Sequence, residues 1–273
     1  MRVVPESFDP AMVAAIDGRL AAVASSYGVR VPWAIESGSR AWGFASPDSD
    51  YDCRFFFVRP RESYLALWPA RDVIETPLEG LLDVNGWDVA KAVRLATAGN
   101  ATVGEWLRSP WVYTGSSAFR DDLLDLVGQV VDPGRLRRHY LHVGRAQWAG
   151  AVASGDADQL MVRLKRVFYA VRPAVTLRWL DEHDGVPPMN LDELIAQADV
   201  PAAVRDEVEE LRLLKSRTRE LGVAPVPRAI AAWVEAVFAA EPDHPSAPSP
   251  ALRAAAEAGF RALVERWAPD APC

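Results

Sequence analysis

Hydrophobic and polar residues follow two different periodicities along the chain, and the change falls near residue 115. Before that point, short runs rich in β-branched and aromatic residues predict strands, and clusters of turn residues separate them. We expect strands over residues 29–36, 51–58, 73–75 and 81–84. Apolar residues at helical spacing predict helices over residues 11–27, 63–68, 89–96 and 102–107. The first part of the chain is therefore expected to combine a small sheet with helices.

After residue 115 the periodicity is almost entirely helical. We expect helices over residues 137–152, 158–171, 202–221 and 251–267. The proline-rich residues 241–250 are expected to form a loop before the last of these helices. The second part of the chain is thus predicted to be helical throughout.

The composition agrees with a folded protein of one large domain or two modest ones. The chain has 273 residues, of which 50% are hydrophobic and 25% are charged, which are ordinary values for a globular protein with a buried core. Together with the change of periodicity, this predicts an α+β fold. A small mixed-sheet domain (residues 1–115) is expected to precede an all-helical domain (residues 116–273).

Charge and cysteine content narrow the possible partners. The formal net charge is −7, whereas proteins that hold nucleic acid mainly by neutralising phosphates are usually basic, so a broad duplex-binding protein is disfavoured. A nucleotide or a short RNA end stays compatible with this charge.

The two cysteines, Cys53 and Cys273, make no disulfide framework, and no Cys or His cluster has zinc-site spacing. Residues 1–20 lack a signal-peptide core and no apolar run approaches the roughly 20 residues that span a bilayer, so we expect a cytoplasmic protein without membrane partners.

The most informative stretch runs from Gly38 to Asp52 and reads GSRAWGFASPDSDYD. Residues two apart in a strand point to the same face, so Asp50 and Asp52 can direct both carboxylates at one point. Two close carboxylates repel each other unless a cation lies between them, and a hard divalent cation with oxygen ligands suits that position. The pair predicts bound Mg²⁺ or Mn²⁺, and two such ions can hold the attacking and the leaving oxygen of a phosphoryl transfer.

The residues before the aspartates suit a triphosphate. Gly38 lets the backbone approach phosphates closely, and the hydroxyl group of Ser39 can donate to a phosphate oxygen at the start of a helix. Arg40 can balance the remaining negative charge. The alternative is an ordinary turn with a solvated acidic edge, since Gly-Ser and Ser-Pro-Asp-Ser-Asp are both common in turns.

At these residues the sequence resembles the nucleotidyltransferases of the DNA polymerase β superfamily. Their pattern is Gly-Ser or Gly-Gly, about ten residues, Asp-x-Asp, and a third carboxylate on a later strand. The longer text GSRAWGFASPDSDYDCRF, with LLDVNGWDVAKAVRL, NATVGEWLRSPWVY and LKRVFYAVRPAVTLRWL, is closer to a bacterial subgroup of predicted nucleotidyltransferases, some linked to RNA repair. The resemblance covers most of the chain to about Leu180. It implies a metal-bound nucleoside triphosphate, attack on its α-phosphorus and release of pyrophosphate, with Asp50 and Asp52 as metal ligands and Gly38 and Ser39 as phosphate contacts.

The third carboxylate has two candidates. Asp83 lies on the strand expected at residues 81–84, where a neighbouring strand can bring it to the metal pair. Asp88 precedes a helix and is equally well explained as its N-cap. We favour Asp83, which by the resemblance would be a metal ligand and the general base for the incoming hydroxyl group.

A polar stripe in the helical part is a second candidate for nucleotide contacts. Lys165, Tyr169 and Arg172 recur at helical spacing beside an apolar stripe, and similar proteins carry the same spacing. The helix could present them to the cleft that the helical domain closes over nucleotide and acceptor, or they could form a solvated face. Pro173 could kink or restart this helix.

The acceptor is not defined by the sequence. An RNA 3′ end, a protein side chain and a small molecule are all compatible with the resemblance. A basic track for RNA could come from Arg135, Arg137, Arg138 and Arg145, which could equally be a solvated helix face, and the same two interpretations apply to Lys215. The alternative function is a non-catalytic nucleotide-binding regulatory or antitoxin-like module.

Overall fold

The structure, a computed structural model, describes residues 1–154, 161–217, 222–240 and 247–270. The chain divides into two compact units, each described here by itself. Unit 1 comprises Met1–Ala41, Asp50–Asp132 and Ala247–Cys273, and unit 2 comprises Trp42–Ser49 and Pro133–Ser246. The short segment Trp42–Ser49, which joins Gly38-Ser39 to Asp50, therefore belongs to unit 2, while the chain on either side of it belongs to unit 1.

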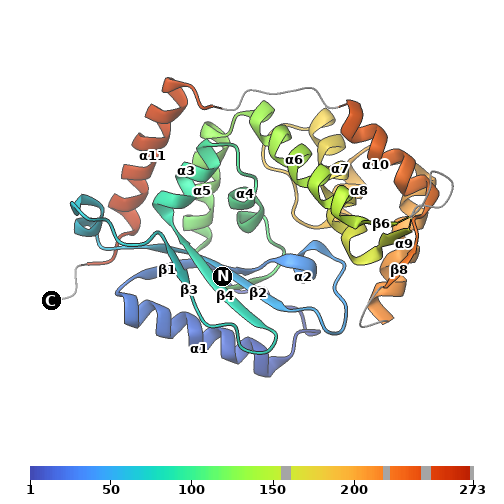
Figure 1. Ribbon diagram of the computed structural model, residues 1–273. Coiled ribbons are helices and arrows are strands. Elements are labelled where there is room, and N and C mark those ends of the chain that lie inside the picture. Colours follow the sequence, from blue (N-terminus) through green and yellow to red (C-terminus); the bar gives the residue numbers. More distant parts are fainter. Residues whose placement is uncertain (155–160, 218–221, 241–246, 271–273) are drawn as a thin grey trace. The chain divides into compact units, whose positions relative to one another are not determined.

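Unit 1 is built on a five-stranded sheet with the strand order β3-β4-β2-β1-β5 (Figure 1). The strands are β1 (Arg30–Glu36), β2 (Tyr51–Val58), β3 (Val73–Glu75), β4 (Leu82–Asp88) and β5 (Val112–Gly115). β2 and β4 run parallel, and the other neighbours are antiparallel, so the sheet is mixed. Because β2 and β4 are neighbours inside the sheet, side chains at equal register on them lie side by side.

Helices cover both faces of this sheet (Figure 1). The helices of unit 1 are α1 (Pro10–Tyr27), α2 (Gly38–Trp42, whose last residue belongs to unit 2), the 3₁₀ helix η1 (Arg61–Leu65), α3 (Val89–Thr97), α4 (Thr102–Leu107), α5 (Ser117–Val130) and α11 (Pro250–Trp267). α1 lies along one face, and its first turn is capped by the Asp9 side chain, which accepts from the Ala11 N–H at 2.8 Å. α3, α4, α5 and α11 gather on the other face.

The side chains of β2 and β4 alternate strictly between these two faces. On the α1 side, the buried core includes Tyr51, Cys53, Phe55, Phe57, Leu82 and Val84. Cys53 is fully buried there, which confirms the expected core-facing side chain. The polar residues Asp52, Arg54, Asp83 and Asn85 therefore lie together on the opposite face. The apolar requirement of one face thus fixes the position of the polar cluster on the other.

Unit 2 is mostly helical. It contains α6 (Pro133–Ala151), α7 (Leu164–Glu182), α8 (Leu191–Gln197), α9 (Ala202–Arg217), α10 (Arg228–Ala240), and the short strands β6 (Val152–Ser154), β7 (Met161–Arg163) and β8 (Val223–Pro225). The longest helices, α6 and α7, pack along each other, and α8 and α10 pack against α7. The three strands form an antiparallel sheet in the order β6-β7-β8.

The α+β class predicted from the sequence is confirmed, and the differences concern short elements. β5 was not expected, and β4 continues to Asp88 instead of ending at residue 84. The expected helix at residues 63–68 is the 3₁₀ helix η1, which begins earlier and ends at Leu65. The part after residue 115 is not all-helical, since residues 161–163 pair with β6 and β8 as a strand. These segments are too short to show a periodicity of their own.

Further expectations concern helix ends and the domain boundary. α7 continues through Pro173, which neither ends nor restarts it. Parts of the expected helices at residues 158–171 and 202–221, and of the proline-rich loop, lie outside the described residues. The compact units also divide the chain differently from the expected boundary at residue 115, because α5 packs on β1 and α11 packs on α5 and α3, which places both helices in unit 1.

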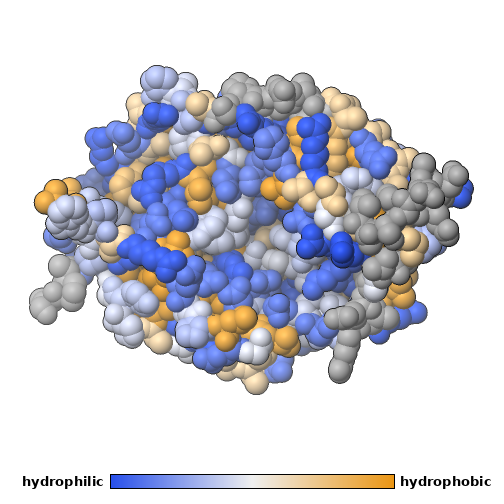
Figure 2. Space-filling view, in the orientation of Figure 1, coloured by the Kyte–Doolittle hydropathy of each residue, from blue (hydrophilic) through white to orange (hydrophobic). Residues whose placement is uncertain are grey.

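Hydrophilic side chains cover most of the face drawn in Figure 2, with hydrophobic ones scattered among them. Among the described residues, the most exposed large hydrophobic side chains are Leu65, Leu67 and Trp68. None of the helices in the described ranges combines the length and the apolar composition that crossing a membrane requires.

The contact between Gly86 on β4 and Phe55 on β2 predicts a stability effect. A Cβ atom at Gly86 would overlap the Phe55 ring, which is fully buried. We expect Gly86→Ala to lower the free energy of unfolding by about 1–3 kcal/mol, the usual range for overpacking. The control is Gly128→Ala in α5, where a Cβ atom meets nothing within 4 Å and alanine should stabilise the helix by about 0.5–1 kcal/mol. Urea denaturation of both variants measures the two effects, and an equal response would contradict this packing.

Candidate functional site

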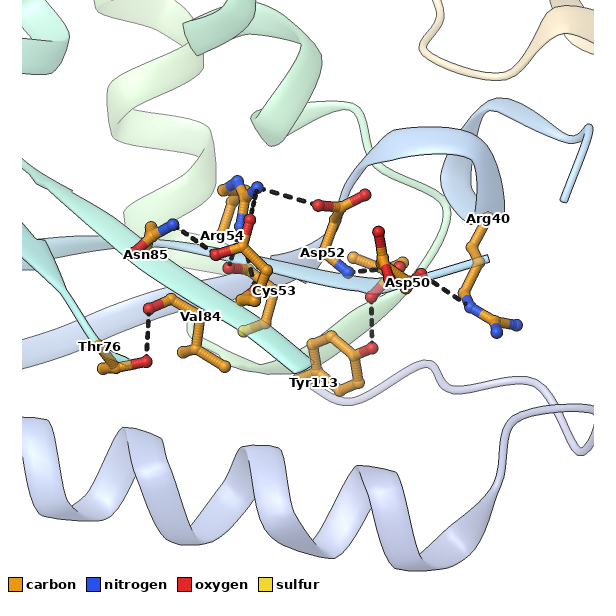
Figure 3. A network of polar contacts seen from close by, with 11 residues as sticks. Arg40, Asp50, Asp52, Cys53, Arg54, Thr76, Val84, Asn85 and Tyr113 are labelled. Carbon is orange, nitrogen blue, oxygen red and sulfur yellow. Dashed lines mark hydrogen bonds and ion pairs between the residues drawn. The ribbon is translucent and has the colours of Figure 1, made fainter. Parts of the chain in front are cut away.

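Two carboxylates of unit 1 meet across the parallel strands β2 and β4. Asp52 and Asp83 are partners in the strand register, and both lie on the polar face of the sheet. The Arg54 guanidinium group donates to Asp52 Oδ1 at 2.9 Å (Figure 3) and to Asp83 Oδ2 at 2.7 Å. The two aspartates therefore converge on a single positive charge.

Asp83 is also held from its other side. Asn85 Nδ2 donates to Asp83 Oδ1 at 2.5 Å, so each carboxylate oxygen of Asp83 accepts a hydrogen bond from a residue on the same sheet face. The Arg54 guanidinium group donates to the Asp83 carbonyl oxygen as well, at 3.0 Å. Hydrogen bonds to both of its carboxylate oxygens thus fix the orientation of Asp83.

Asp50 lies just before β2 and its side chain is exposed. Its backbone carbonyl oxygen accepts from Arg40 Nε at 3.0 Å (Figure 3). The Arg40 guanidinium group stacks over the Tyr51 ring, with its central carbon 3.9 Å from the ring centroid. Arg40 therefore holds the backbone that presents Asp50.

Burial and charge act on Asp52 together. Partial burial raises the pKa of the Asp52 carboxyl group, the Arg54 charge opposes this, and the negative charges of Asp83 and Asp50 add to the increase. A cation near the three aspartates would relieve this repulsion. The site is therefore electrostatically prepared for positive charge.

The donors suit a hard divalent cation, although Arg54 occupies the point of convergence. Within the described ranges, no group of three or more His, Cys, Asp or Glu side chains is arranged to hold a metal ion. Asp52 and Asp83 nevertheless already direct oxygen atoms at one cation, and oxygen ligands are those that Mg²⁺ and Mn²⁺ prefer. The residues fit such an ion once the guanidinium group moves away.

Gly38 allows the backbone of α2 to approach this carboxylate. It has a positive φ of 59°, and a Cβ atom at this position would overlap Asp52 Oδ2. Any other residue would both strain the backbone and displace the Asp52 side chain. Ser39 follows in the first turn of α2 and is buried. The predicted phosphate contacts Gly38 and Ser39 thus lie directly beside Asp52.

A buried carboxyl group below the site was missed by sequence reasoning. Glu36, at the end of β1, is fully buried, accepts from the Asp52 backbone N–H at 3.0 Å and accepts from the Tyr113 hydroxyl group at 2.5 Å. Burial raises the pKa of Glu36 to about 8, against the opposing effect of its hydrogen bonds. The available signal was an acidic residue closing an otherwise apolar strand just before Gly38.

The alternative third carboxylate, Asp88, has a structural role. It is buried, it caps α3 by accepting from the Ala90 N–H at 2.8 Å, and it forms an ion pair with Arg59 at 3.4 Å. The structure therefore brings Asp83 to Asp52 and places Asp88 five residues farther along the chain, at the start of α3.

The three candidate nucleotide contacts on α7, Lys165, Tyr169 and Arg172, lie in unit 2 in different environments. Lys165 is exposed. The Tyr169 ring packs edge-on against Trp42, at 5.3 Å between ring centroids. Arg172 is buried, donates from Nε to the Met189 carbonyl oxygen at 2.9 Å and lies over the Trp42 ring at 5.1 Å. Their contact with a nucleotide stays a prediction, and Arg172 has a packing role besides.

Several arginines of the expected basic track on α6 have partners within unit 2. Arg135 is buried, Arg137 pairs with Asp181 at 2.7 Å, and Arg145 donates to the Phe238 carbonyl oxygen at 2.5 Å. These contacts favour a structural role over a track for RNA.

A cavity of about 310 Å³ in unit 1 lies between α3 and α11. Its lining includes Val93, Thr97, Ala256 and Phe260 and none of the three aspartates. It is therefore distinct from the carboxylate site.

Comparison with known proteins adds independent information. A family model described as the RNA repair pathway DNA polymerase beta family matches residues 12–261, which is most of the chain. The uncharacterized protein YcgL of Bacillus subtilis is 36% identical over 203 residues, covering 73% of this chain and 75% of that protein. The carboxylates, Gly38 and Ser39 all fall inside the matched range.

The raised pKa of Glu36 predicts a pH-dependent stability. The folded protein keeps the proton of Glu36 up to about pH 8, whereas the unfolded chain loses it near 4.5, so this group's contribution to stability is lost as the pH rises between those values. Glu36→Gln keeps an acceptor for the Asp52 N–H but does not titrate. We expect its free energy of unfolding, relative to the wild type, to increase by up to about 4 kcal/mol from pH 5 to pH 8.

Chemical denaturation of the metal-free proteins at several pH values measures this difference. Glu79→Gln is the control, because Glu79 is an exposed partner of Arg19. A constant difference between Glu36→Gln and the wild type across this pH range would show that Glu36 is ionised in the folded protein.

The position of Arg54 predicts competition with divalent cations. Arg54→Met removes the guanidinium group that pairs with both Asp52 and Asp83, so Mn²⁺ should bind about tenfold tighter or better than to the wild type. The same variant should unfold at a lower temperature without Mn²⁺ and regain stability when Mn²⁺ is added. Calorimetric titration measures the Mn²⁺ affinity, and thermal unfolding measures the stability. Arg71→Met is the control, because it removes an arginine whose ion pair with Glu75 is exposed. Weaker Mn²⁺ binding in Arg54→Met would mean that Arg54 arranges the ligands instead of competing with the ion.

Proposed function

Since the chain belongs to the RNA repair pathway DNA polymerase β family, we propose that it is a metal-dependent nucleotidyltransferase. It transfers a nucleoside monophosphate from a nucleoside triphosphate to a hydroxyl acceptor and releases pyrophosphate. The observation that carries the proposal is the meeting of Asp52 and Asp83 on adjacent strands, with the Gly38 backbone against Asp52.

The proposed roles follow from the positions of the side chains. Asp50, Asp52 and Asp83 would hold Mg²⁺ or Mn²⁺ as a pair of ions, which would neutralise phosphate charge and lower the pKa of a bound hydroxyl group. Gly38 and Ser39 contact the phosphates, because the glycine leaves the backbone accessible beside Asp52. Glu36 and Arg40 fix the backbone of Asp52 and Asp50.

The reaction itself exchanges one ester bond for another. Asp83, oriented by Asn85, accepts the proton of the acceptor hydroxyl group, whose oxygen attacks the α-phosphorus. The bond from the α-phosphorus to the bridging oxygen of the β-phosphate breaks, and pyrophosphate leaves with that electron pair. On unit 2, Lys165, Tyr169 and Arg172 are the proposed additional nucleotide contacts.

We favour an RNA 3′ end as the acceptor, because the matching family is described by an RNA repair pathway. The arginines of α6 give little support for a long RNA track, since Arg137 and Arg145 have partners within unit 2. An RNA bound mainly through its terminal nucleotide at the carboxylate site agrees better with these paired arginines than a long duplex does. A protein or small-molecule acceptor is the alternative outcome of the acceptor assay.

One observation favours a second function, that of a nucleotide-binding module without turnover. Arg54 fills the point where the carboxylates converge, and the described residues contain no ready group of three metal-binding side chains. If the guanidinium group stays there when nucleotide binds, the protein binds without catalysing.

Pyrophosphate release from labelled nucleoside triphosphates, with Mg²⁺ and mixed acceptors, separates the two functions. We expect turnover by the wild type and its loss in Asp50→Asn and Asp52→Asn, because each removes a negative ligand of the ions. Asp83→Asn should lower kcat by about 10²–10⁴-fold, the range for general-base loss, while nucleotide affinity changes less. Asp88→Asn is the matched control, because asparagine caps a helix as well as aspartate does.

The result for Asp88→Asn decides between the two candidate carboxylates. Activity close to the wild type is expected, with at most a loss of stability from the broken Arg59 ion pair. A catalytic loss in Asp88→Asn equal to that in Asp83→Asn would contradict the assignment. Nucleotide binding without turnover on any acceptor would establish the binding module instead.

A further inference from the structure

Residues 61–72 of unit 1, which we call the hook, expose three large hydrophobic side chains. The hook comprises η1 and the chain that leads to β3. Leu65 and Leu67 each expose 82% of their surface, and Trp68 exposes 85%. Hydrophobic side chains project at the left margin of the face drawn in Figure 2, where this segment lies in Figure 1. Single exposed leucines are common, but three such side chains within four residues indicate an interaction site.

The cavity between α3 and α11 lies beside the hook. Tyr64 of the hook packs edge-on against Phe260, at 5.3 Å between ring centroids, and Asp72 forms an ion pair with Arg94 at 2.6 Å. Phe260 and Arg94 both line the cavity, whereas none of the three exposed hydrophobic side chains of the hook, which the structure describes throughout, lines it. The hook is therefore anchored at the margin of the cavity without filling it.

The cavity has the size and the lining to hold a large hydrophobic side chain. Its volume is about 310 Å³, and its walls include Val93, Thr97, Ala256 and Phe260. An apolar cavity of about 150 Å³ already holds a benzene molecule, so an indole ring fits in about twice that volume. Tryptophan is also among the residues that contribute most to protein interfaces. The hook and the cavity are thus complementary in size and in polarity.

The hook and the cavity also carry opposite charges. Glu62 in η1 and Arg253 in the lining of the cavity are both exposed. Neither side chain forms an ion pair with any residue that the structure describes. The other charged side chains that line the cavity, Arg94 and Glu257, have partners on the same chain. A free acid and a free base on neighbouring parts of one surface fit a partner that carries the same two groups.

We propose that the hook docks into the α3–α11 cavity of a second copy of this chain. Because hook and cavity lie side by side on one unit, a two-fold axis brings the hook of each copy to the cavity of the other. Trp68 enters the cavity of the other copy, and Glu62 of each copy meets Arg253 of the other. A protein of different shape would fill one of these features and leave the second open, whereas a second copy satisfies both.

The area of such an interface agrees with a reversible dimer. A tryptophan side chain buries about 150–250 Å². Two hooks, together with the cavity walls that they cover, bury on the order of 1,000 Å² or more, which is near the lower limit for specific interfaces. The dimer should accordingly form at micromolar concentrations and dissociate on dilution.

Analytical ultracentrifugation of the full chain over a range of concentrations measures the dimer affinity. We expect the wild type to reach the mass of two chains. Trp68→Ser should weaken the dimer about 30-fold or more, the effect of losing a tryptophan at the centre of an interface. Leu67→Ser should weaken it by less. Leu78→Ser is the matched control, because it removes an exposed leucine outside the hook and should leave the affinity unchanged.

Ala256→Leu tests the same contact from the side of the cavity. A leucine at this position fills part of the cavity, so the hook of the other copy cannot enter fully. The dimer should weaken about tenfold or more. The unfolding temperature of the dissociated protein should stay the same or rise, because filling a cavity usually stabilises a fold. Trp68→Ser should also leave this temperature unchanged, since Trp68 is exposed within its own chain.

Exchanging the charges separates this arrangement from non-specific association of hydrophobic side chains. Glu62→Arg and Arg253→Glu should each weaken the dimer about 3- to 10-fold, because like charges then meet across the interface. The double variant restores opposite charges and should dimerise about as tightly as the wild type.

Four results would overturn the proposal. A wild type that stays monomeric at every concentration would leave the hook for a different partner. Equal dimer affinity of the wild type and Trp68→Ser would place the interface elsewhere. Failure of the double charge variant to recover would refute the contact between Glu62 and Arg253. Open-ended association instead of a dimer would show a head-to-tail contact without a two-fold axis.

Discussion

The ion pairs of Arg54 with Asp52 and Asp83 are the interaction on which the rest of the site depends. They exist because β2 and β4 run parallel and in register, so two carboxylates lie side by side on one face of the sheet. The register in turn follows from the opposite face, where Cys53 and Val84 are buried against α1. A slip of one residue would bury the carboxylates and expose the core, so the hydrophobic pattern itself positions the chemistry.

The site also imposes demands on the fold below it. Burial disfavours the ionised form of Glu36, yet its carboxyl group fixes the Asp52 backbone and accepts a hydrogen bond from Tyr113 on β5. Residue 38 must be glycine because a Cβ atom there would overlap Asp52 Oδ2, and glycine loses more conformational entropy on folding than other residues. Buried polar groups and an obligatory glycine reduce stability locally, and such features are expected where a structure is shaped for binding or catalysis.

The sequence predicted the parts of the site that lie within short local patterns. The spacing of Asp50 and Asp52 and the Gly38-Ser39 pair required only strand geometry, and Asp83 followed from an expected strand. Arg54 and Glu36 were missed, because their partners come from strands whose pairing a single sequence does not determine. The short strands of unit 2 and the membership of residues 42–49 in that unit depend on contacts distant in sequence, so periodicity gave no sign of them.

The central claim is that Asp52 and Asp83 form a cation site that Arg54 occupies in the absence of metal. The most direct measurement is anomalous diffraction from crystals grown with Mn²⁺ and a non-hydrolysable nucleoside triphosphate. The account predicts an anomalous peak about 2.0–2.4 Å from oxygen atoms of both aspartates, with the Arg54 guanidinium group withdrawn from at least one of them. Bound nucleotide with both Arg54 ion pairs intact and no peak beside the aspartates would contradict it.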